Sequence, residues 1–318
     1  MDALAGFLDG PRARGAFLLR SVLEPPWSLR IQDEAPLTVV AVMRGGAWLW
    51  HDDRPAERLG PGDVAVVRGP EPYTVADDPA TPPQILIHPG QRCTTLHGED
   101  LADVMGLGVR TWGNHLDAAT MMLTGTYQLE GEISQRLLDA LPARLVLRAD
   151  QWSCPVIPLL GDEIVKDEPG QEVVLDRLLD LLLIAVLRAW FARPEAVGPS
   201  WFRAHEDPVV GRALRLLHHE PGRPWTVATL AADAGVSRAA LARRFTELVG
   251  EPPMSFLTGW RIALAADLLR EPGATVASVA RQVGYGSPFA LSTAFKRLRG
   301  VSPQQHRAAS RTAALERS

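Results

Sequence analysis

Basic side chains are concentrated in two short stretches near the end of this chain of 318 residues. The charged members of these stretches are Arg238, Arg243, Arg244, Lys296, Arg297 and Arg299. Guanidinium and ammonium groups neutralise nucleic-acid phosphates, and arginine can also hold guanine through two hydrogen bonds. These residue types therefore indicate recognition of DNA. A solvated helix face is the alternative interpretation for Arg244, Arg297 and Arg299.

A second group of side chains could bind a metal ion or undergo oxidation. Cys93 and His97 lie four positions apart, and His115 and Cys154 could approach them in space. Zinc sites usually have tighter paired spacings, so a buried thiol and surface imidazoles are the simpler interpretation. We expect no metal and no cofactor. Two cysteines 61 positions apart permit a redox pair but do not indicate one.

The front half of the chain carries strand-like runs: LTVVAVM, GGAWLWH, DVAVVRG and QILIH. Gly, Pro and Asp separate these runs, which predicts a small antiparallel barrel or sandwich. Four side chains of this region could line a small-ligand site, although aromatic residues in strands are more often ordinary core. They are Trp48, Trp50, Tyr73 and His88.

The segment GPGDVAVVRGPEPYTV resembles the second half of a cupin repeat. In a metal-dependent cupin a histidine would be expected where Tyr73 stands, and the barrel segment has no His-x-His pair. We therefore expect the barrel to bind a small ligand or a partner. Residues 173–191 form a wide apolar helical stripe, and packing on the barrel and self-association both stay open as its role.

Two helices joined by a tight corner are predicted near the C-terminus. Thr275 can cap the first helix, and Gly284 gives the backbone freedom at the corner. Ser287 can cap the second helix, with Pro288 at its first position. Apolar side chains then recur along one face at Leu291, Ala294, Phe295 and Leu298. This pattern is typical of a helix-turn-helix.

An earlier stretch, TVATLAADAGVSRAALARRF from 226 to 245, repeats the same plan. The two copies align at an offset of 49 residues before the corner and 50 after it, so the additional residue falls in the turn. They form an internal repeat, joined by a longer helix. Two recognition helices held one repeat apart could reach successive major-groove segments roughly 34 Å apart.

The pattern LAADAGVSRAALARRF … RIALAADLL … VARQVGYGSPFALSTAFKRLRGVSPQQHR resembles the DNA-binding domain of AraC/XylS-type bacterial transcription regulators over about 207–307. One departure is His306, because that family usually has Tyr before the residue matching Arg307; this is a packing position. The front half also resembles the cupin-type sensor domain of these regulators.

The resemblance implies which side chains face the DNA groove. In the first recognition helix they are Arg238, Ala239, Ala242 and Arg243, with Arg244 beside them. In the second they are Pro288, Phe289, Ala290 and Thr293, beside Ser292, Lys296 and Arg297. We expect the first helix to make most of the polar base contacts. The second should read thymine methyl groups and anchor through Lys296 and Arg297.

The charge is unevenly distributed along the chain. Residues 205–318 hold 15 basic and 9 acidic residues, a net of +6, whereas the remainder holds 18 and 28, a net of −10. An acidic front and a basic back suggest two roles on one chain. Two cysteines cannot build a disulfide framework, and neither a signal peptide nor an uncharged span is visible. We therefore expect a soluble cytoplasmic protein.

The sequence thus predicts an α+β chain of two domains. We expect a cupin-like β-barrel with helices over 1–198 as sensor and dimerisation domain, a linker over 199–207, and an all-α domain with two helix-turn-helix units over 208–309. The expected function is sequence-specific transcription regulation, as activator or repressor, controlled by a signal in the front domain. Expected partners are double-stranded DNA, a second copy, a small-molecule effector and RNA polymerase. The alternatives are a metal-dependent cupin enzyme fused to a DNA-binding domain, and a sensor controlled by a protein partner.

Overall fold

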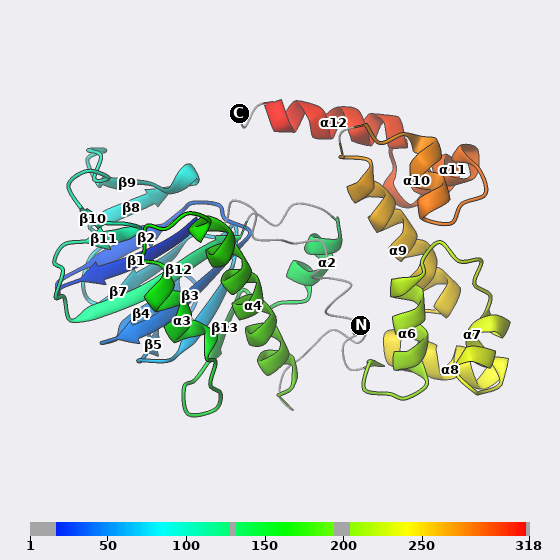
Figure 1. Cartoon of the computed structure of the whole chain (residues 1–318), viewed down its shortest axis with the longest axis horizontal. Helices are drawn as coiled ribbons and strands as arrows, with labels where there is room; N and C mark the ends of the chain where they lie inside the picture. The colour runs from blue at the N-terminus through cyan, green and yellow to red at the C-terminus, as the bar shows by residue number, and fades with distance from the viewer. Residues whose placement is uncertain (1–16, 128–131, 194–203, 272, 316–318) are drawn as a thin grey trace. The chain divides into compact units, whose positions relative to one another are not determined.

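A computed structural model describes residues 17–127, 132–193, 204–271 and 273–315. They form two compact units, which we call the sandwich unit and the helical unit. The sandwich unit contains all the described strands, and the helical unit contains the residues from 204 onward together with 132–137 (Figure 1). One boundary between the units falls within 194–203, outside the described residues, as does most of the expected linker, and another falls between residues 137 and 138. None of the described helices is long and apolar enough to cross a membrane.

Two β-sheets build the sandwich unit. The first runs, in spatial order, β10 (Gly106–Gly108), β11 (Thr111–Gly113), β1 (Phe17–Leu23), β12 (Thr120–Tyr127), β3 (Leu37–Arg44), β6 (Val64–Arg68) and β13 (Arg144–Leu147). The second runs β5 (Glu57–Leu59), β4 (Ala47–His51), β7 (Tyr73–Ala76), β2 (Ser28–Ile31), β8 (Ile85–His88) and β9 (Arg92–Thr95). Neighbouring strands are antiparallel except for the parallel pairs β1–β11 and β2–β8.

The core of this unit lies between the two sheets. Both sheets contribute buried apolar side chains to one cluster, including Val40, Val42 and Met122 from the first and Leu49, Val75 and Ile85 from the second. The end strands of each sheet pair on one side only, so the expected barrel is an open sandwich and not a closed one. Closure would require hydrogen bonds between the edges of the two sheets.

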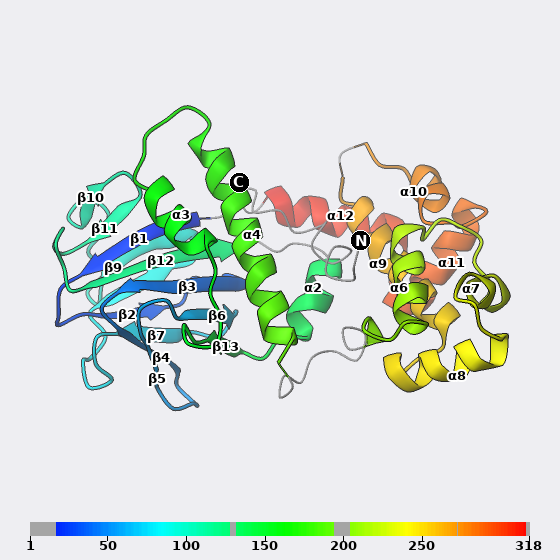
Figure 2. The ribbon, with the colours of Figure 1, turned by 60° about the horizontal axis from the view of Figure 1, so that its bottom comes forward.

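Helices α3 (Val156–Glu163) and α4 (Gln171–Phe191) lie on the outer face of the first sheet (Figure 2). The Tyr127 hydroxyl of β12 donates a hydrogen bond to the Leu179 carbonyl at 2.8 Å. The inward stripe of α4 is buried at Leu175, Leu179, Leu182, Leu183, Val186 and Leu187. Val174 and Leu181 on the opposite side stay 44% and 49% exposed. Helix α4 therefore packs on the sheet through its inward stripe and leaves apolar side chains exposed on its opposite side.

The helical unit contains two small cores joined by one helix. Its elements are α2 (Glu132–Asp139, up to residue 137), α6 (Val210–His219), α7 (Val227–Asp233), α8 (Arg238–Val249), α9 (Pro253–Leu268), α10 (Val276–Gln282), α11 (Pro288–Arg299) and α12 (Pro303–Leu315). Phe256 and Leu257 of α9 pack in the core of α6, α7 and α8. Ile262, Ala265 and Ala266 of the same helix pack in the core of α10 and α11.

Candidate nucleic-acid interface and sensor cavity

Capping residues fix where the two helices of the first helix-turn-helix begin. The Thr226 hydroxyl accepts a hydrogen bond from the Thr229 backbone N–H, and the Thr229 hydroxyl accepts one from the Thr226 backbone N–H, which closes a capping box at the start of α7. Gly235 has φ of +71°, a conformation that suits glycine at a helix end. The Ser237 hydroxyl then accepts from the Ala240 N–H and starts α8. Leu241 and Phe245 hold α8 against the core.

The second helix-turn-helix reproduces these contacts. Thr275 and Ser278 form the capping box of α10, Gly284 has φ of +81°, and Ser287 caps α11 through the Ala290 N–H. Leu291 and Phe295 are the buried side chains of α11. Leu298, which was expected on the inner face, is 50% exposed because the core ends one turn earlier.

The predicted DNA-facing side chains of α8 lie on its accessible side. Arg238, Ala239 and Arg243 are exposed and Ala242 is half-buried. Arg243 stands 3.9 Å from Glu247 in a solvent-exposed pair, which holds it weakly. Arg238 forms no ion pair with any residue in the described part of the chain. Both guanidinium groups can therefore turn toward a ligand.

Arg244 differs from its neighbours because it is bound within the unit. Its Nε donates to the Asp207 carboxylate at 2.7 Å. The same carboxylate accepts the backbone N–H groups of Val209 and Val210 and so caps α6. Burial tends to raise the pKa of Asp207, but these hydrogen bonds and the Arg244 charge hold it below its usual value. Sequence patterns do not reveal this pair, because its members are 37 positions apart.

The outer face of α11 is nearly free of hydrogen-bond donors at its start. Pro288 and Phe289 are exposed, the latter by 81%, and Ala290 is half-buried. The hydroxyls of Ser292 and Thr293 donate back to the carbonyls of residues 288 and 289 in the preceding turn.

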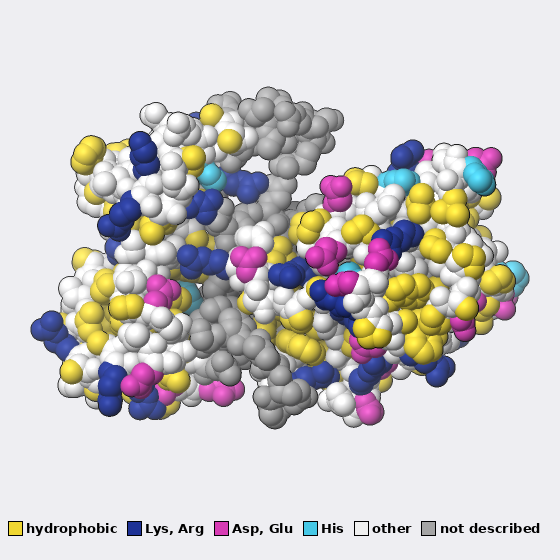
Figure 3. Space-filling view, turned by 180° about the vertical axis from the view of Figure 1, so that it is seen from behind, with side chains coloured by type: hydrophobic (Ala, Val, Ile, Leu, Met, Phe, Trp, Pro, Cys, Tyr) yellow, Lys and Arg dark blue, Asp and Glu magenta, His cyan; other side chains and the backbone are white. Residues whose placement is uncertain are grey.

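Further along α11, Lys296 and Arg297 are exposed and form no ion pair with the residues that the structure describes. Figure 3 shows Lys and Arg side chains spread over the helical unit, at the left of that view. The arrangement offers cations along the side of α11 and apolar contacts at its start.

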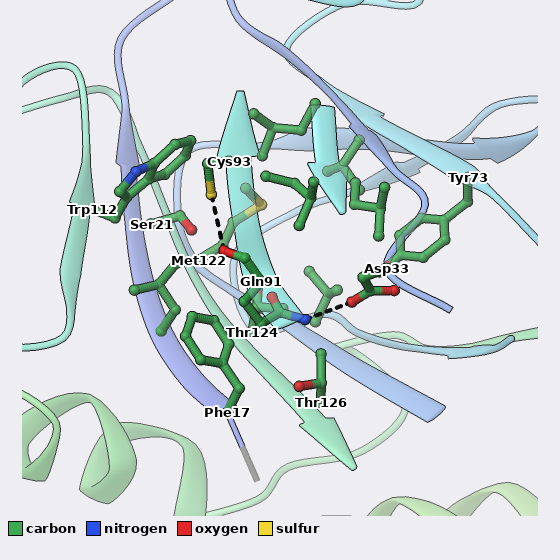
Figure 4. Close-up of a pocket in the computed structure, with 16 residues that line it drawn as sticks. Phe17, Ser21, Asp33, Tyr73, Gln91, Cys93, Trp112, Met122, Thr124 and Thr126 are labelled. Atoms are coloured by element: carbon green, nitrogen blue, oxygen red, sulfur yellow. Dashed lines mark hydrogen bonds between the residues drawn. The ribbon is translucent and has the colours of Figure 1, made fainter. Parts of the chain in front are cut away.

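The sandwich unit contains a cavity of about 60 Å³ between its sheets. Its walls are mainly apolar, and Asp33, Gln91 and Tyr73 stand on one side of it (Figure 4). The Gln91 amide donates to the Asp33 carboxylate at 2.8 Å. No lysine, arginine or histidine in the described residues lines this cavity.

Of the four predicted ligand-site residues, Tyr73 lines the cavity. Trp48 and Trp50 point away from it, because side chains alternate along β4 and Ala47 and Leu49 face the core. His88 instead lies 2.9 Å from the Thr94 hydroxyl. Asp33 and Gln91 were missed, since neither belongs to a strand pattern. An acidic side chain next to a β-strand is the signal that Asp33 gives, and Gln91 gives no comparable signal.

The candidate metal ligands do not come together. Cys93 lines the cavity, where burial raises its pKa to about 11, so the thiol stays protonated at neutral pH. His97 and His115 are exposed, and Cys154 borders a separate groove beside Trp152. Within the described residues no group of three or more His, Cys, Asp or Glu side chains is placed to hold a metal ion.

Comparisons with known proteins agree with this two-part architecture. Residues 2–192 match the cupin family, and residues 230–309 match a helix-turn-helix domain. An AraC-like transcription regulator of Streptomyces lividans is 34% identical over 316 residues, covering 96% of this chain and 98% of the relative. A protein of the same description from Streptomyces antibioticus is 33% identical over 317 residues, with the same coverage of each chain.

Two further proteins extend the comparison. The HTH-type transcriptional regulator AlkR of Acinetobacter baylyi is 26% identical over 313 residues, covering 96% of this chain and 99% of the relative. Among solved structures, the DNA-binding domain of the transcriptional factor AdpA in complex with a target DNA is 37% identical. The match covers 34% of this chain and 96% of that chain, with a TM-score of 0.32.

The fold and the exposed recognition helices define a helix-turn-helix DNA-binding regulator with a cupin-type front domain. The chain belongs to the AraC family of transcription regulators. The full-length relatives are named as regulators and not as enzymes, so the alternative of a metal-dependent cupin enzyme is set aside.

Proposed function

We propose that the two recognition helices divide the work of reading DNA. Helix α8 makes the polar base contacts through Arg238 and Arg243, and α11 contacts thymine methyl groups and phosphates. The observation that carries this proposal is the contrast between exposed guanidinium groups on α8 and the α11 hydroxyls that donate to their own helix. Arginine pairs to guanine discriminate between bases, whereas apolar side chains suit the methyl group of thymine.

Gel-shift titration of two matched variants tests this division, on a duplex selected from a randomised pool. Arg243→Ala should cost about 1–3 kcal/mol of specific binding, because a bidentate base contact is lost. Thr293→Ala should change affinity by less than about threefold, because its hydroxyl is already engaged within the helix. The proposal is wrong if Thr293→Ala abolishes binding while Arg243→Ala leaves it intact.

We also propose that the sandwich unit senses a signal through its cavity. An anion buried there would lie beside Asp33 without a cationic partner, which is costly in a low-dielectric site. The cavity therefore favours a small, mostly apolar molecule that is neutral or cationic. Such a ligand changes DNA binding only if it binds one state of the protein more tightly than the other.

Three probes of similar shape test the ligand class: pentanol, pentylamine and pentanoate. Pentanol and pentylamine should raise the unfolding temperature, since a ligand of the folded state stabilises by mass action. Pentanoate should not, and Asp33→Asn should remove any preference for the amine over the alcohol. Stronger stabilisation by pentanoate would contradict the assignment.

We further propose that the protein acts as a homodimer through the outward side of α4. Val174 and Leu181 leave an apolar stripe there after the inward stripe is covered. Exposed apolar stripes of this kind are typical of association surfaces. A second copy would present the same stripe, so the contact would be symmetric.

A further inference from the structure

The two helix-turn-helix units contact each other directly as well as through the helix that joins them. Gly222, in the loop between α6 and α7, packs against the backbone of the second unit. A Cβ added at Gly222 would meet the Gln282 carbonyl oxygen at 2.9 Å. A Cβ added at Gly284 would meet the Gly222 carbonyl oxygen at 2.6 Å. The two backbones thus approach as closely as glycine allows.

Arg261 of α9 connects this contact to the central helix. Its Nε donates to the Pro221 carbonyl and its Nη2 to the Arg223 carbonyl, both at 2.7 Å. Its guanidinium also lies 5.9 Å from the ring centre of Tyr285, at the corner of the second unit. One side chain therefore holds the loop of the first unit and touches the turn of the second.

The loop that Arg261 holds is itself fixed to the first core. Trp225 is buried there, and its indole N–H donates to the Glu220 carbonyl at 2.9 Å. The Arg223 guanidinium stacks 4.1 Å from the centre of the Trp225 ring. Because the loop is anchored in this way, it moves together with the first helix-turn-helix unit.

Helix α9 joins the two helix-turn-helix units. Its first half packs in one core and its second half in the other, and Figure 1 shows it passing between the two groups of helices. Hydrogen bonds donated by a charged group are stronger than neutral ones, so the Arg261 bonds to Pro221 and Arg223 add to this packing in fixing one unit against the other. The close approach of Gly222 and Gly284 limits their relative movement further.

We propose that Gly222, Arg261 and Gly284, which we call the latch, set the distance and rotation between the two recognition helices. The latch thereby determines the spacing of the two DNA segments that the protein accepts. This inference rests on the proposed reading of two segments. One added base pair moves the second segment by about 3.4 Å and rotates it by roughly 35°. Two recognition helices held in a fixed arrangement cannot follow that change, whereas helices that can move relative to each other can.

The test measures affinity of the full chain for duplexes derived from a selected site, with one or two base pairs inserted between its two segments. Wild type should lose roughly tenfold or more on insertion, because the second contact is no longer reached. Arg261→Ala, which removes both carbonyl contacts, should flatten this dependence on spacing. Gly222→Ala should do the same, since its Cβ pushes the units apart at a φ that alanine tolerates.

Gly286→Ala is the matched control. Gly286 belongs to the same corner, but a Cβ there meets nothing within 4 Å, so the wild-type spacing dependence should persist. Equal losses at every spacing in Arg261→Ala and Gly222→Ala would show a merely structural role and overturn the proposal. A flat spacing profile in wild type would overturn it too. A footprint confined to one segment in wild type would instead overturn the reading of two segments.

Discussion

Arg244 uses its guanidinium for an ion pair with Asp207 inside the helical unit. Its position on α8 is one that the family resemblance associates with DNA, and half of its side chain stays exposed. The carboxylate of Asp207 also caps α6, so the pair joins the beginning of the unit to the recognition helix. The residue therefore positions α8 before any DNA is bound.

His218 makes the stability of the helical unit depend on pH. It is buried against Trp260 and Phe256, with ring centres 4.5 and 5.5 Å away. Burial is the main cause that lowers its pKa from 6.5 to about 3, and the charges of His205, His219 and Arg136 contribute to the same shift. The unfolded chain takes up this proton below about pH 6.5 and the folded chain does not. The free energy of unfolding should then fall by up to about 1.4 kcal/mol per pH unit on acidification.

Urea unfolding at a series of pH values between about 7.5 and 5 checks this prediction. The contribution is fully present at neutral pH and is lost progressively toward the folded pKa. In His218→Phe, which keeps an aromatic ring in the core, the slope should decrease. An unchanged slope in that variant would assign the pH dependence to other groups.

At the scale of elements, capping residues and apolar spacing predict the helical unit well. Thr226, Ser237, Thr275 and Ser287 start helices where their types indicate, because a cap is decided by local hydrogen bonds. Strands β1, β2 and β13, like β5, β9, β10 and β11, were not predicted. Strands β2 and β13 have only four residues each, and β1 (FLLRSVL) lacks clear alternation. Pairing with strands distant in the chain stabilises β1, β2 and β13.

The cavity and the latch are beyond prediction from sequence patterns for a related reason. The cavity requires two sheets to face each other, and the latch joins Gly222 to Gly284, which are far apart in the chain. Local patterns carry no information on such contacts. The aromatic residues of β4 illustrate this: their type suggested a ligand site, but the alternation of the strand turns them away from the cavity.

The outward stripe of α4 gives a prediction at this scale. Leu181→Glu places a charge at the centre of the proposed contact and should shift the protein from dimer to monomer in sedimentation velocity at micromolar concentration. Leu96→Glu, which introduces the same charge at an exposed leucine outside α4, serves as the control for a nonspecific effect of the charge. A monomeric wild type, or a dimer unaffected by Leu181→Glu, would contradict the proposed contact.

At the scale of the whole molecule, the proposed functions assign ligand sensing and DNA binding to two units with different charge. The basic helical unit carries two copies of one reader, whose recognition helices differ in chemistry. The acidic sandwich unit carries a largely apolar cavity. A ligand in the cavity can change the affinity for operator DNA only if the protein has two states and each partner binds one of them more tightly.

Reading of two successive DNA segments by α8 and α11 is the property on which the proposed function depends. Hydroxyl-radical footprinting of the full chain on a duplex selected from a randomised pool tests it most directly. We expect two protected patches on one face of the duplex, roughly 34 Å apart. Arg243→Ala should weaken the patch under α8 more than the patch under α11. A single protected patch, or equal affinity for unrelated sequences at the same salt concentration, would contradict it.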